Sequence, residues 1–196
     1  MITGIVLAAG ESLRMGSPKM LLPWHGRSVV EAVVASLREG GLERILIVVG
    51  GGREGVEQAL AGAQVGFAFN PAFARGEMLS SIQAGLRAMD DETEAAMLTP
   101  GDLPRIRPAT VRAVMEAMAA APARIGVPVY GGRRGHPVLV PRAYWPALLA
   151  LGEGDSLRTF LRAHEDEIAR VEVPDPGIHA DLDTPSDYQR AVKRKG

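Results

Sequence analysis

Cysteine is absent from the 196-residue chain. This absence excludes disulfides, a thiolate nucleophile and zinc or iron–sulfur sites that depend on cysteine ligands. The 22 basic and 23 acidic residues nearly cancel to a net charge of -1, so no general field attracts the protein to nucleic acid or to an anionic membrane. The N-terminal segment has neither a basic leader nor a long apolar run. We therefore expect a cytoplasmic protein without a signal peptide, a membrane span or a nucleic-acid partner.

Internal repeats and low-complexity linkers are also missing, and 46% of the residues are hydrophobic. This composition supports one core of substantial size, so we expect a single domain over residues 1–196. Short β-branched runs alternate with segments of helical period, which is typical of an α/β fold with a mostly parallel sheet. The expected strands are residues 2–7, 44–49, 65–69, 95–99, 124–129, 136–140 and 168–173. The expected helices are residues 28–39, 55–60, 79–89, 109–121, 142–151, 156–164 and 186–193.

Directly after the first expected strand, residues 7–23 read LAAGESLRMGSPKMLLP. Gly10 and Gly16 allow the loop to bend so that backbone N–H groups point inward, and Arg14 and Lys19 add two cations suited to phosphate oxygens. The spacing is not that of a Walker loop, which requires four residues between its glycines and the sequence Gly-Lys-Ser/Thr. The loop favours binding of a nucleoside triphosphate, and the alternative is a solvated surface loop.

A second glycine-rich segment follows the strand ILIVV, where Gly50, Gly52 and Gly55 match the spacing of a dinucleotide fingerprint. That fingerprint also requires an acidic residue about 20 positions further on to bind a ribose hydroxyl. Asn70 stands at that position. The segment therefore predicts a structural turn.

Aspartates occur in two segments. Asp102, in LTPGDLP, directly follows a strand expected to be central in the sheet, and a carboxylate there faces the ligand crevice of an open α/β sheet and can bind Mg²⁺. In HADLDTPSDY, Thr184 and Asp187 are explained as helix caps. Asp181 and Asp183 remain, and alternate residues of an extended segment point the same way. Either could join Asp102 at one metal, whereas alone each reads as an ordinary turn residue.

Two further segments carry polar candidates. In NPAFARGEMLSSIQAGL, Ser81 lies near a helix start, where a hydroxyl can bind a base or a ribose, although serine is also an ordinary helix cap. In GGRRGHPVLV, Arg134 and His136 precede an apolar strand. This basic loop could bind an anionic acceptor, or it could be a solvated turn.

In this order the segments LAAGESLRMGSPK, NPAFARGEMLSSIQAGL, GDLP, RGHPVLV and DLDTPSD resemble the MobA-like nucleotidyltransferases over nearly the whole chain. The resemblance is greatest to the branch of that family that transfers a cytidylyl group to the molybdenum cofactor. It implies a single Rossmann-like, three-layer α/β domain that binds nucleotide along the carboxyl ends of its strands.

The resemblance also implies roles for individual residues. Arg14 and Lys19 would hold the triphosphate opposite the carboxylates, and Asp102 would bind Mg²⁺ with help from Asp183 rather than Asp181. The nucleotide would be lined by Leu7, Ala8, Ala9, Gly10 and Ser81.

Guanylyl-transferring members typically carry LAGG where this chain has LAAG, and the extra methyl group of Ala9 would narrow the base pocket. The resemblance thus implies CTP as the nucleotide and molybdenum-bound molybdopterin as the phosphorylated acceptor, with a molybdoenzyme or chaperone receiving the product. Uridylyl and sugar-phosphate transferases also use LAAG. A sugar-1-phosphate nucleotidyltransferase and a non-catalytic nucleotide or cofactor chaperone therefore remain as alternatives.

Overall fold

A computed structural model describes residues 1–10, 18–75 and 78–193. In this part of the chain eight strands form one sheet in the order β10-β7-β9-β6-β1-β4-β5, with β8 paired to β7, and β2 and β3 form a separate hairpin. The strands are β1 (Ile2–Ala8), β2 (Pro23–Trp24), β3 (Arg27–Ser28), β4 (Arg44–Val49), β5 (Gly66–Phe69), β6 (Ala95–Pro100), β7 (Ile125–Tyr130), β8 (Arg133–Arg134), β9 (Val138–Pro141) and β10 (Ile168–Glu172). The strand β1 pairs in parallel with β4 and β6, and β9 is antiparallel to β6 and β7.

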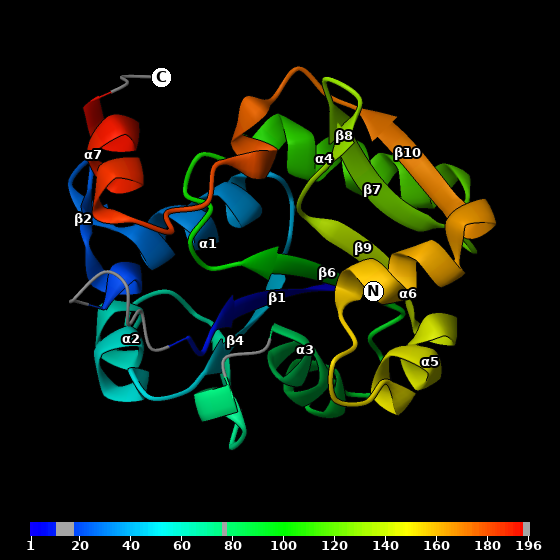
Figure 1. The fold of residues 1–196 in the computed structure, drawn as a ribbon, viewed down its shortest axis with the longest axis horizontal. Coiled ribbons are helices and arrows are strands. Elements are labelled where there is room, and N and C mark those ends of the chain that lie inside the picture. The colour runs from blue at the N-terminus through cyan, green and yellow to red at the C-terminus, as the bar shows by residue number, and fades with distance from the viewer. Residues whose placement is uncertain (11–17, 76–77, 194–196) are drawn as a thin grey trace.

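Helices cover both faces of this sheet, so the domain has three layers (Figure 1). The α-helices are α1 (Val29–Glu39), α2 (Arg53–Ala59), α3 (Met78–Arg87), α4 (Pro108–Ala120), α5 (Trp145–Ala150), α6 (Leu157–Ala163) and α7 (Pro185–Lys193). Short 3-10 segments are η2 (Lys19–Leu21), η3 (Phe73–Arg75), η4 (Arg142–Tyr144), η5 (Glu165–Glu167) and η6 (Pro176–His179). The expected α/β fold with a mostly parallel sheet is confirmed.

Two cores lie on the two faces of the sheet, and β1 contributes alternate residues to each. Val6 and Ala8 pack with buried residues of α1 and α4, whereas Ile5 and Leu7 pack with buried residues of α3, α5 and α6. This alternation follows from the two-residue period of a strand. Within the described residues, no helix combines the length and apolar character needed to cross a membrane.

The structure confirms two helix starts that the sequence predicts. The Ser28 N–H donates to Glu31 Oε2 at 2.6 Å, and the Glu31 N–H donates to Ser28 Oγ at 3.4 Å, which completes the capping box of α1. At α7 the Asp187 N–H donates to Thr184 Oγ1 at 3.2 Å, and the Thr184 N–H donates to Asp187 Oδ2 at 2.9 Å. Hydrogen bonds from Ser28 and Thr184 lower the pKa values of Glu31 and Asp187 respectively.

Local geometry differs from the sequence expectation at several places, among them the strand β8 where a loop was expected. The expected strand at 136–140 begins at Val138, and the expected helix at 142–151 begins as the 3-10 segment η4 before α5 starts at Trp145. The β2–β3 hairpin was not expected. Its two loop residues, His25 and Gly26, have positive φ angles of 46° and 89°. Two residues with positive φ angles in a two-residue loop match the twist of the antiparallel strands that they join. The hairpin was not expected because His-Gly is a weaker signal for this turn than Asn-Gly.

Candidate active site

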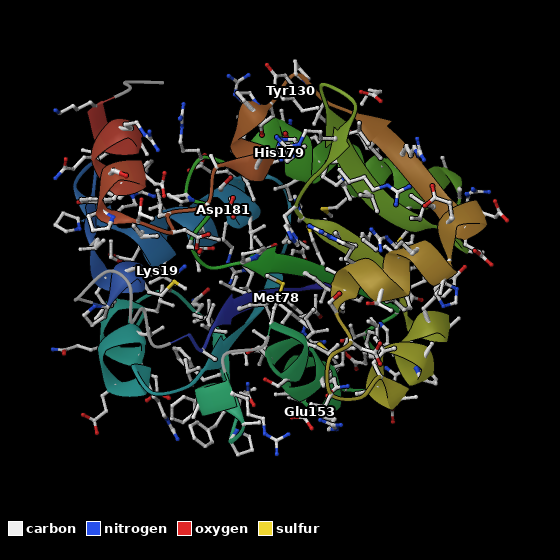
Figure 2. The ribbon with its side chains drawn as sticks, viewed as in Figure 1. Lys19, Met78, Tyr130, Glu153, His179 and Asp181 are labelled. Carbon is white, nitrogen blue, oxygen red and sulfur yellow. The ribbon has the colours of Figure 1, made fainter. Side chains whose placement is uncertain are left out.

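The carboxyl ends of β1 and β6 bring the first loop and the GDLP segment together. Leu7 of β1 lies opposite Pro100 of β6, so the residues that follow each strand emerge at one edge of the sheet. A cavity of about 350 Å³ opens there. It is lined by most of the residues that the sequence predicts: Leu7, Ala9, Gly10, Lys19, Ser81, Asp102, His136, Asp181 and Asp183. In Figure 2, Lys19, Met78 and Asp181 lie around this edge and come from three separate segments.

Among the described residues, the predicted Ala8 and Arg134 do not line this cavity. Arg14 lies outside the described residues. The side chain of Ala8 is buried in the core on the α1 and α4 face of the sheet, because successive side chains of β1 point to opposite faces. Arg134 forms an ion pair with Glu165, which also pairs with Arg170 at 2.7 Å. The structure therefore does not bring the Arg134 side chain to the predicted acceptor position.

Lys19 joins the two aspartate segments. Its Nζ forms an ion pair with Asp102 Oδ2 and lies 3.5 Å from Asp183 Oδ1. The side chains of Lys19 and Asp102 are only 16% and 11% exposed, whereas that of Asp183 is 46% exposed. The ammonium group of Lys19, at the start of η2, lies beside both carboxylates, because opposite charges attract at this distance. That Lys19 faces the carboxylates across a bound triphosphate stays a prediction.

The carboxylates of Asp102 and Asp183 converge on one point, since each contacts the same Lys19 nitrogen. Within the described residues no group of three or more His, Asp or Glu side chains is arranged to hold a metal ion. Mg²⁺ commonly binds one or two carboxylates and takes its remaining ligands from water and substrate phosphates. The Asp102 and Asp183 pair fits a cation of that kind, completed by a bound substrate.

Asp181 lines the same cavity and is the third carboxylate near Lys19. Its pKa is raised, first by desolvation and then by the negative charges of Asp102 and Asp183. Two carboxylates thus already disfavour a third charge at this position. A charged Asp181 is thus disfavoured, whereas Asp183 lies within ion-pair distance of Lys19. These two observations support Asp183 as the second carboxylate, beside Asp102, of a metal site.

Backbone contacts hold the two aspartate segments in place. The Leu182 N–H donates to the Asp102 carbonyl oxygen at 3.2 Å, and the Gly101 N–H donates to the Leu7 carbonyl oxygen at 2.9 Å. A Cβ atom on Gly101 would lie 3.0 Å from that Leu7 oxygen and 3.0 Å from Met20 Sδ. A side chain at position 101 would therefore be crowded where the end of β6 approaches β1 so closely.

Ser81 is held by a buried amide. Asn70 is only 2% exposed, and its Nδ2 donates to Ser80 Oγ at 2.9 Å and to Ser81 Oγ at 3.1 Å. Its Oδ1 accepts the Ala72 N–H at 2.9 Å. Ser81 lies within α3 and lines the cavity, so it is not the cap of that helix. Asn70 thus positions the hydroxyl group that the sequence predicts to contact the base.

The sequence interpretation did not identify the apolar part of this cavity, which is formed by Met20, Phe73, Met78, Pro100, Leu103 and Ile178. Met78 is 45% exposed and stands at the start of α3. Its place directly before LSS, the segment that carries Ser81, is the sequence signal that could have found it. The other apolar residues lack such a signal, because an alternating or helical apolar pattern predicts burial without saying that one side of the residue faces a cavity.

His136 enters the cavity uncharged. Burial lowers its pKa to about 4, against weaker opposing effects of a hydrogen bond with the Leu98 backbone and of the Asp102 carboxylate. Its Nδ1 is buried and has no hydrogen-bond partner within the described residues. The ring is therefore neutral at pH 7 and offers a hydrogen bond to a ligand rather than a positive charge.

This low pKa predicts a pH-dependent loss of stability. Between pH 6.5 and about 4 the unfolded chain binds a proton at His136 that the folded protein does not bind, so the free energy of unfolding falls as the pH is lowered through this range. We expect His136→Gln to lose less of this free energy than wild type between pH 7 and pH 4.5, as measured by urea unfolding. Equal losses in both proteins would show that His136 is not buried uncharged.

Asp175 is a buried carboxylate that the sequence interpretation did not single out. It is 1% exposed, and it accepts hydrogen bonds from Thr110 Oγ1 at 2.6 Å, the Arg107 N–H at 2.9 Å and the Gly177 N–H at 2.9 Å. These bonds fix η6 against the start of α4. The segment η6 supplies Ile178 to the cavity and leads directly into the Asp181 to Asp183 segment.

Asp175→Ala is expected to lower the free energy of unfolding by about 3 kcal/mol, because three donors lose their acceptor inside the protein. Urea unfolding at pH 7 measures this loss. The matched control is Asp166→Ala, which removes an exposed carboxylate of η5 and should change stability little. Similar small effects of the two substitutions would argue against the anchoring role of Asp175.

The arrangement as a whole defines a class of protein. A mostly parallel α/β sheet presents a partly buried cation and converging carboxylates at its carboxyl edge, which is where proteins with this architecture bind nucleotides and phosphorylated ligands. The family model of the MobA-like NTP transferase domain matches residues 4–168. The chain belongs to this family of nucleotidyltransferases.

Curated relatives and solved structures match over nearly the full length of the chain. Molybdenum cofactor cytidylyltransferase from Escherichia coli K12 is 29% identical over 97% of this chain and 95% of its own length. Nicotine blue oxidoreductase from Paenarthrobacter nicotinovorans is also 29% identical, over 97% of this chain and 96% of its own. The crystal structure of Rv0371c from Mycobacterium tuberculosis H37Rv has a TM-score of 0.84 and 27% identity over 98% of both chains. A complex of Rv0371c with manganese has a TM-score of 0.75 over 99% of both chains.

Proposed function

We propose that this protein transfers CMP from CTP to the terminal phosphate of molybdenum-bound molybdopterin and releases pyrophosphate, in a reaction that depends on Mg²⁺. The observation that carries the proposal is the convergence of Asp102 and Asp183 on Lys19 at the carboxyl edge of the sheet. Family membership supports the reaction class, and the similarity to molybdenum cofactor cytidylyltransferase supports the acceptor and the base. The absence of cysteine supports a cytoplasmic location.

Charge neutralisation and positioning would provide most of the catalysis. A phosphate oxygen of the acceptor forms a bond to the α-phosphorus of CTP, while the bond from that phosphorus to the bridging oxygen of the β-phosphate breaks. Pyrophosphate leaves with the electron pair of the broken bond. The attacking oxygen is already anionic, so the step needs no strong general base. Lys19 would balance the charge that grows on the phosphates.

The metal would be held by the two converging carboxylates, Asp102 and Asp183. Bound Mg²⁺ supplies charge neutralisation on the phosphate oxygens. Because Lys19 contacts the same carboxylates, we expect its ammonium group to move toward the triphosphate when the metal and the nucleotide bind. The manganese complex of the structurally similar Rv0371c supports binding of a divalent cation by this fold. Arg14 stays a predicted phosphate ligand, since it lies outside the described residues.

The choice of base would depend on Ala9 and Ser81. Both line the cavity, Ala9 is 3% exposed, and its carbonyl oxygen lies against Gly50, where an added Cβ would come within 2.4 Å. The Ala9 backbone therefore has little freedom to retreat from a larger base. This restriction favours a pyrimidine, and the Ser81 hydroxyl group can donate to the base or accept from it.

A second enzyme class must be tested, because nicotine blue oxidoreductase shows the same identity and nearly the same coverage as the cytidylyltransferase. Identity therefore does not choose between them. The carboxylates that converge on Lys19 favour transfer from a metal-bound triphosphate.

The test is a screen for pyrophosphate release with CTP, GTP and UTP, each with Mg²⁺ and with either molybdenum-bound molybdopterin or sugar 1-phosphates as acceptors. We expect release with CTP and the molybdopterin acceptor, and at least about tenfold less with GTP. Release with a sugar 1-phosphate alone would favour the sugar-nucleotide alternative. Tight CTP binding without release under any condition would favour a nucleotide-binding chaperone.

A further inference from the structure

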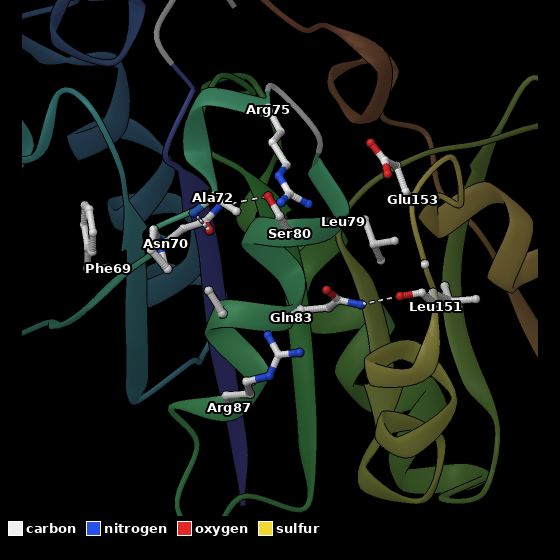
Figure 3. Close-up of a pocket in the computed structure, with 13 residues that line it drawn as sticks. Phe69, Asn70, Ala72, Arg75, Leu79, Ser80, Gln83, Arg87, Leu151 and Glu153 are labelled. Carbon is white, nitrogen blue, oxygen red and sulfur yellow. Dashed lines mark hydrogen bonds between the residues drawn. The ribbon is translucent and has the colours of Figure 1, made fainter.

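A second cavity, of about 430 Å³, is lined by Ser80. The neighbouring residue Ser81 lines the cavity of about 350 Å³ described above, which we call the nucleotide cavity. Figure 3 shows it between α3, the loop that follows β5 and the segment after α5. Leu79, Ala84 and Leu151 give it an apolar wall. Its volume falls in the range of small-molecule binding sites. Its lining includes none of the described residues that the sequence predicts to bind nucleotide, acceptor or metal. Ser80, which does line it, is the neighbour of the predicted residue Ser81.

Two cations face this cavity. Arg75 and Arg87 are exposed, and neither forms an ion pair within the described residues. Their guanidinium groups point toward each other along one side of α3 (Figure 3). Ser80 lies beside Arg75 in Figure 3, and the helix α3 rises by about 10 Å from Ser80 to Arg87. Glu153, on the opposite wall, is the one carboxylate among the described lining residues. The cavity thus carries a local excess of positive charge.

Gln83 adds an oriented hydrogen-bond acceptor. Its Nε2 donates to the carbonyl oxygens of Leu148 at 3.1 Å and Leu151 at 3.0 Å, and it lies 3.5 Å from that of Leu149. These contacts fix the orientation of the amide, because only its nitrogen can donate to carbonyl groups. The Gln83 Oε1 is therefore turned away from the carbonyls and is left to accept an N–H from a ligand in the cavity (Figure 3).

Asn70 connects the second cavity with the nucleotide cavity. Its buried amide holds Ser80, which lines the second cavity, and Ser81, which lines the nucleotide cavity. Both cavities are thus bounded by one fixed turn of α3.

We propose that this second cavity binds a small anionic molecule whose flat ring or amine carries N–H donors. The anionic group is recognised by Arg75 and Arg87, an N–H is recognised by Gln83 Oε1, and the ring packs on the Leu79 and Leu151 wall. Glu153 disfavours a polyanion such as a triphosphate, because the net charge of the charged lining side chains is only about +1. This proposal does not depend on which nucleotide the first cavity binds.

The test uses two probes of this class, orotate and pyridoxamine 5′-phosphate, which differ in whether the anion is a carboxylate or a phosphate. Saturation-transfer NMR and calorimetry measure their binding to the full chain. We expect at least one probe to bind wild type, and the Arg75→Ala/Arg87→Ala double variant to bind it at least about tenfold more weakly. Arg158→Ala, which removes an exposed arginine of α6, is the matched control and should bind as wild type.

Lys19→Ala separates the two cavities. It alters only the nucleotide cavity, so binding of the probe should be unchanged in this variant, whatever the variant does to CTP. The proposal is overturned if neither probe binds wild type, or if the double variant binds with wild-type affinity. It is also overturned if Lys19→Ala abolishes the binding, because the probe then occupies the nucleotide cavity.

Discussion

Lys19→Ala is expected to lower the rate of pyrophosphate release from CTP by at least about 100-fold. The substitution removes the cation that Asp102 and Asp183 share, and with it the group expected to balance charge on the phosphates. Steady-state release with saturating CTP, acceptor and Mg²⁺ measures this effect. Lys19→Arg should recover part of the rate, because it keeps the charge but replaces a compact ammonium with a wider fork.

Lys193→Ala is the matched control, since it removes an exposed lysine at the end of α7. We expect this control to turn over as wild type. Lys19 is not one of the residues that form the hydrophobic cores, so its loss should leave the fold intact by circular dichroism. A folded Lys19→Ala protein that turns over as wild type would remove Lys19 from the catalytic machinery.

Asp102→Asn is expected to lower the same rate by about 100-fold or more. The substitution keeps the shape of the side chain but removes the negative charge that would hold Mg²⁺. If metal binding is the lost function, the Mg²⁺ concentration that gives half-maximal release should rise strongly. A stability effect alone would not raise it, so a Mg²⁺ titration separates the two explanations.

Asp90→Asn provides the control for this substitution. Asp90 is an exposed aspartate that pairs with Arg44 and does not line the cavity, and Arg44 holds its pKa below the usual range. We expect normal release and a normal Mg²⁺ requirement. Were Asp102→Asn to show the same Mg²⁺ requirement as wild type, the metal would have to be held elsewhere.

The sequence predicts most of the fold because its signals are local. The capping residues Ser28 and Thr184 are the N-caps of α1 and α7, and the β-branched runs predict the strands β1, β4 and β6 to within one residue at each end. The strand β9 was predicted but its antiparallel direction was not, and the small β2–β3 hairpin was not predicted. Their directions depend on pairing with strands far along the chain or on a His-Gly turn, and neither is a strong local signal.

The candidate site is predictable where a residue directly follows a parallel strand. Gly10 and Asp102 follow β1 and β6, so the topology brings them to one edge of the sheet. The ion-pair partners of Lys19 and Arg134 could not be predicted, because they depend on which opposite charges lie nearest in the folded chain. The role of Asp175 could not be predicted for a related reason. The groups that donate hydrogen bonds to it lie in η6 and α4, about 70 residues apart in the chain.

The most direct test of the account is a transfer reaction that follows each phosphate of CTP separately. Wild-type protein is incubated with Mg²⁺, molybdenum-bound molybdopterin and CTP labelled at either the α- or the γ-phosphorus. We expect the α-label to enter the acceptor as CMP, the γ-label to leave as pyrophosphate, and Lys19→Ala and Asp102→Asn to slow both by at least about 100-fold. Appearance of the γ-label in inorganic phosphate, or no transfer of the α-label to any phosphorylated acceptor, would contradict it.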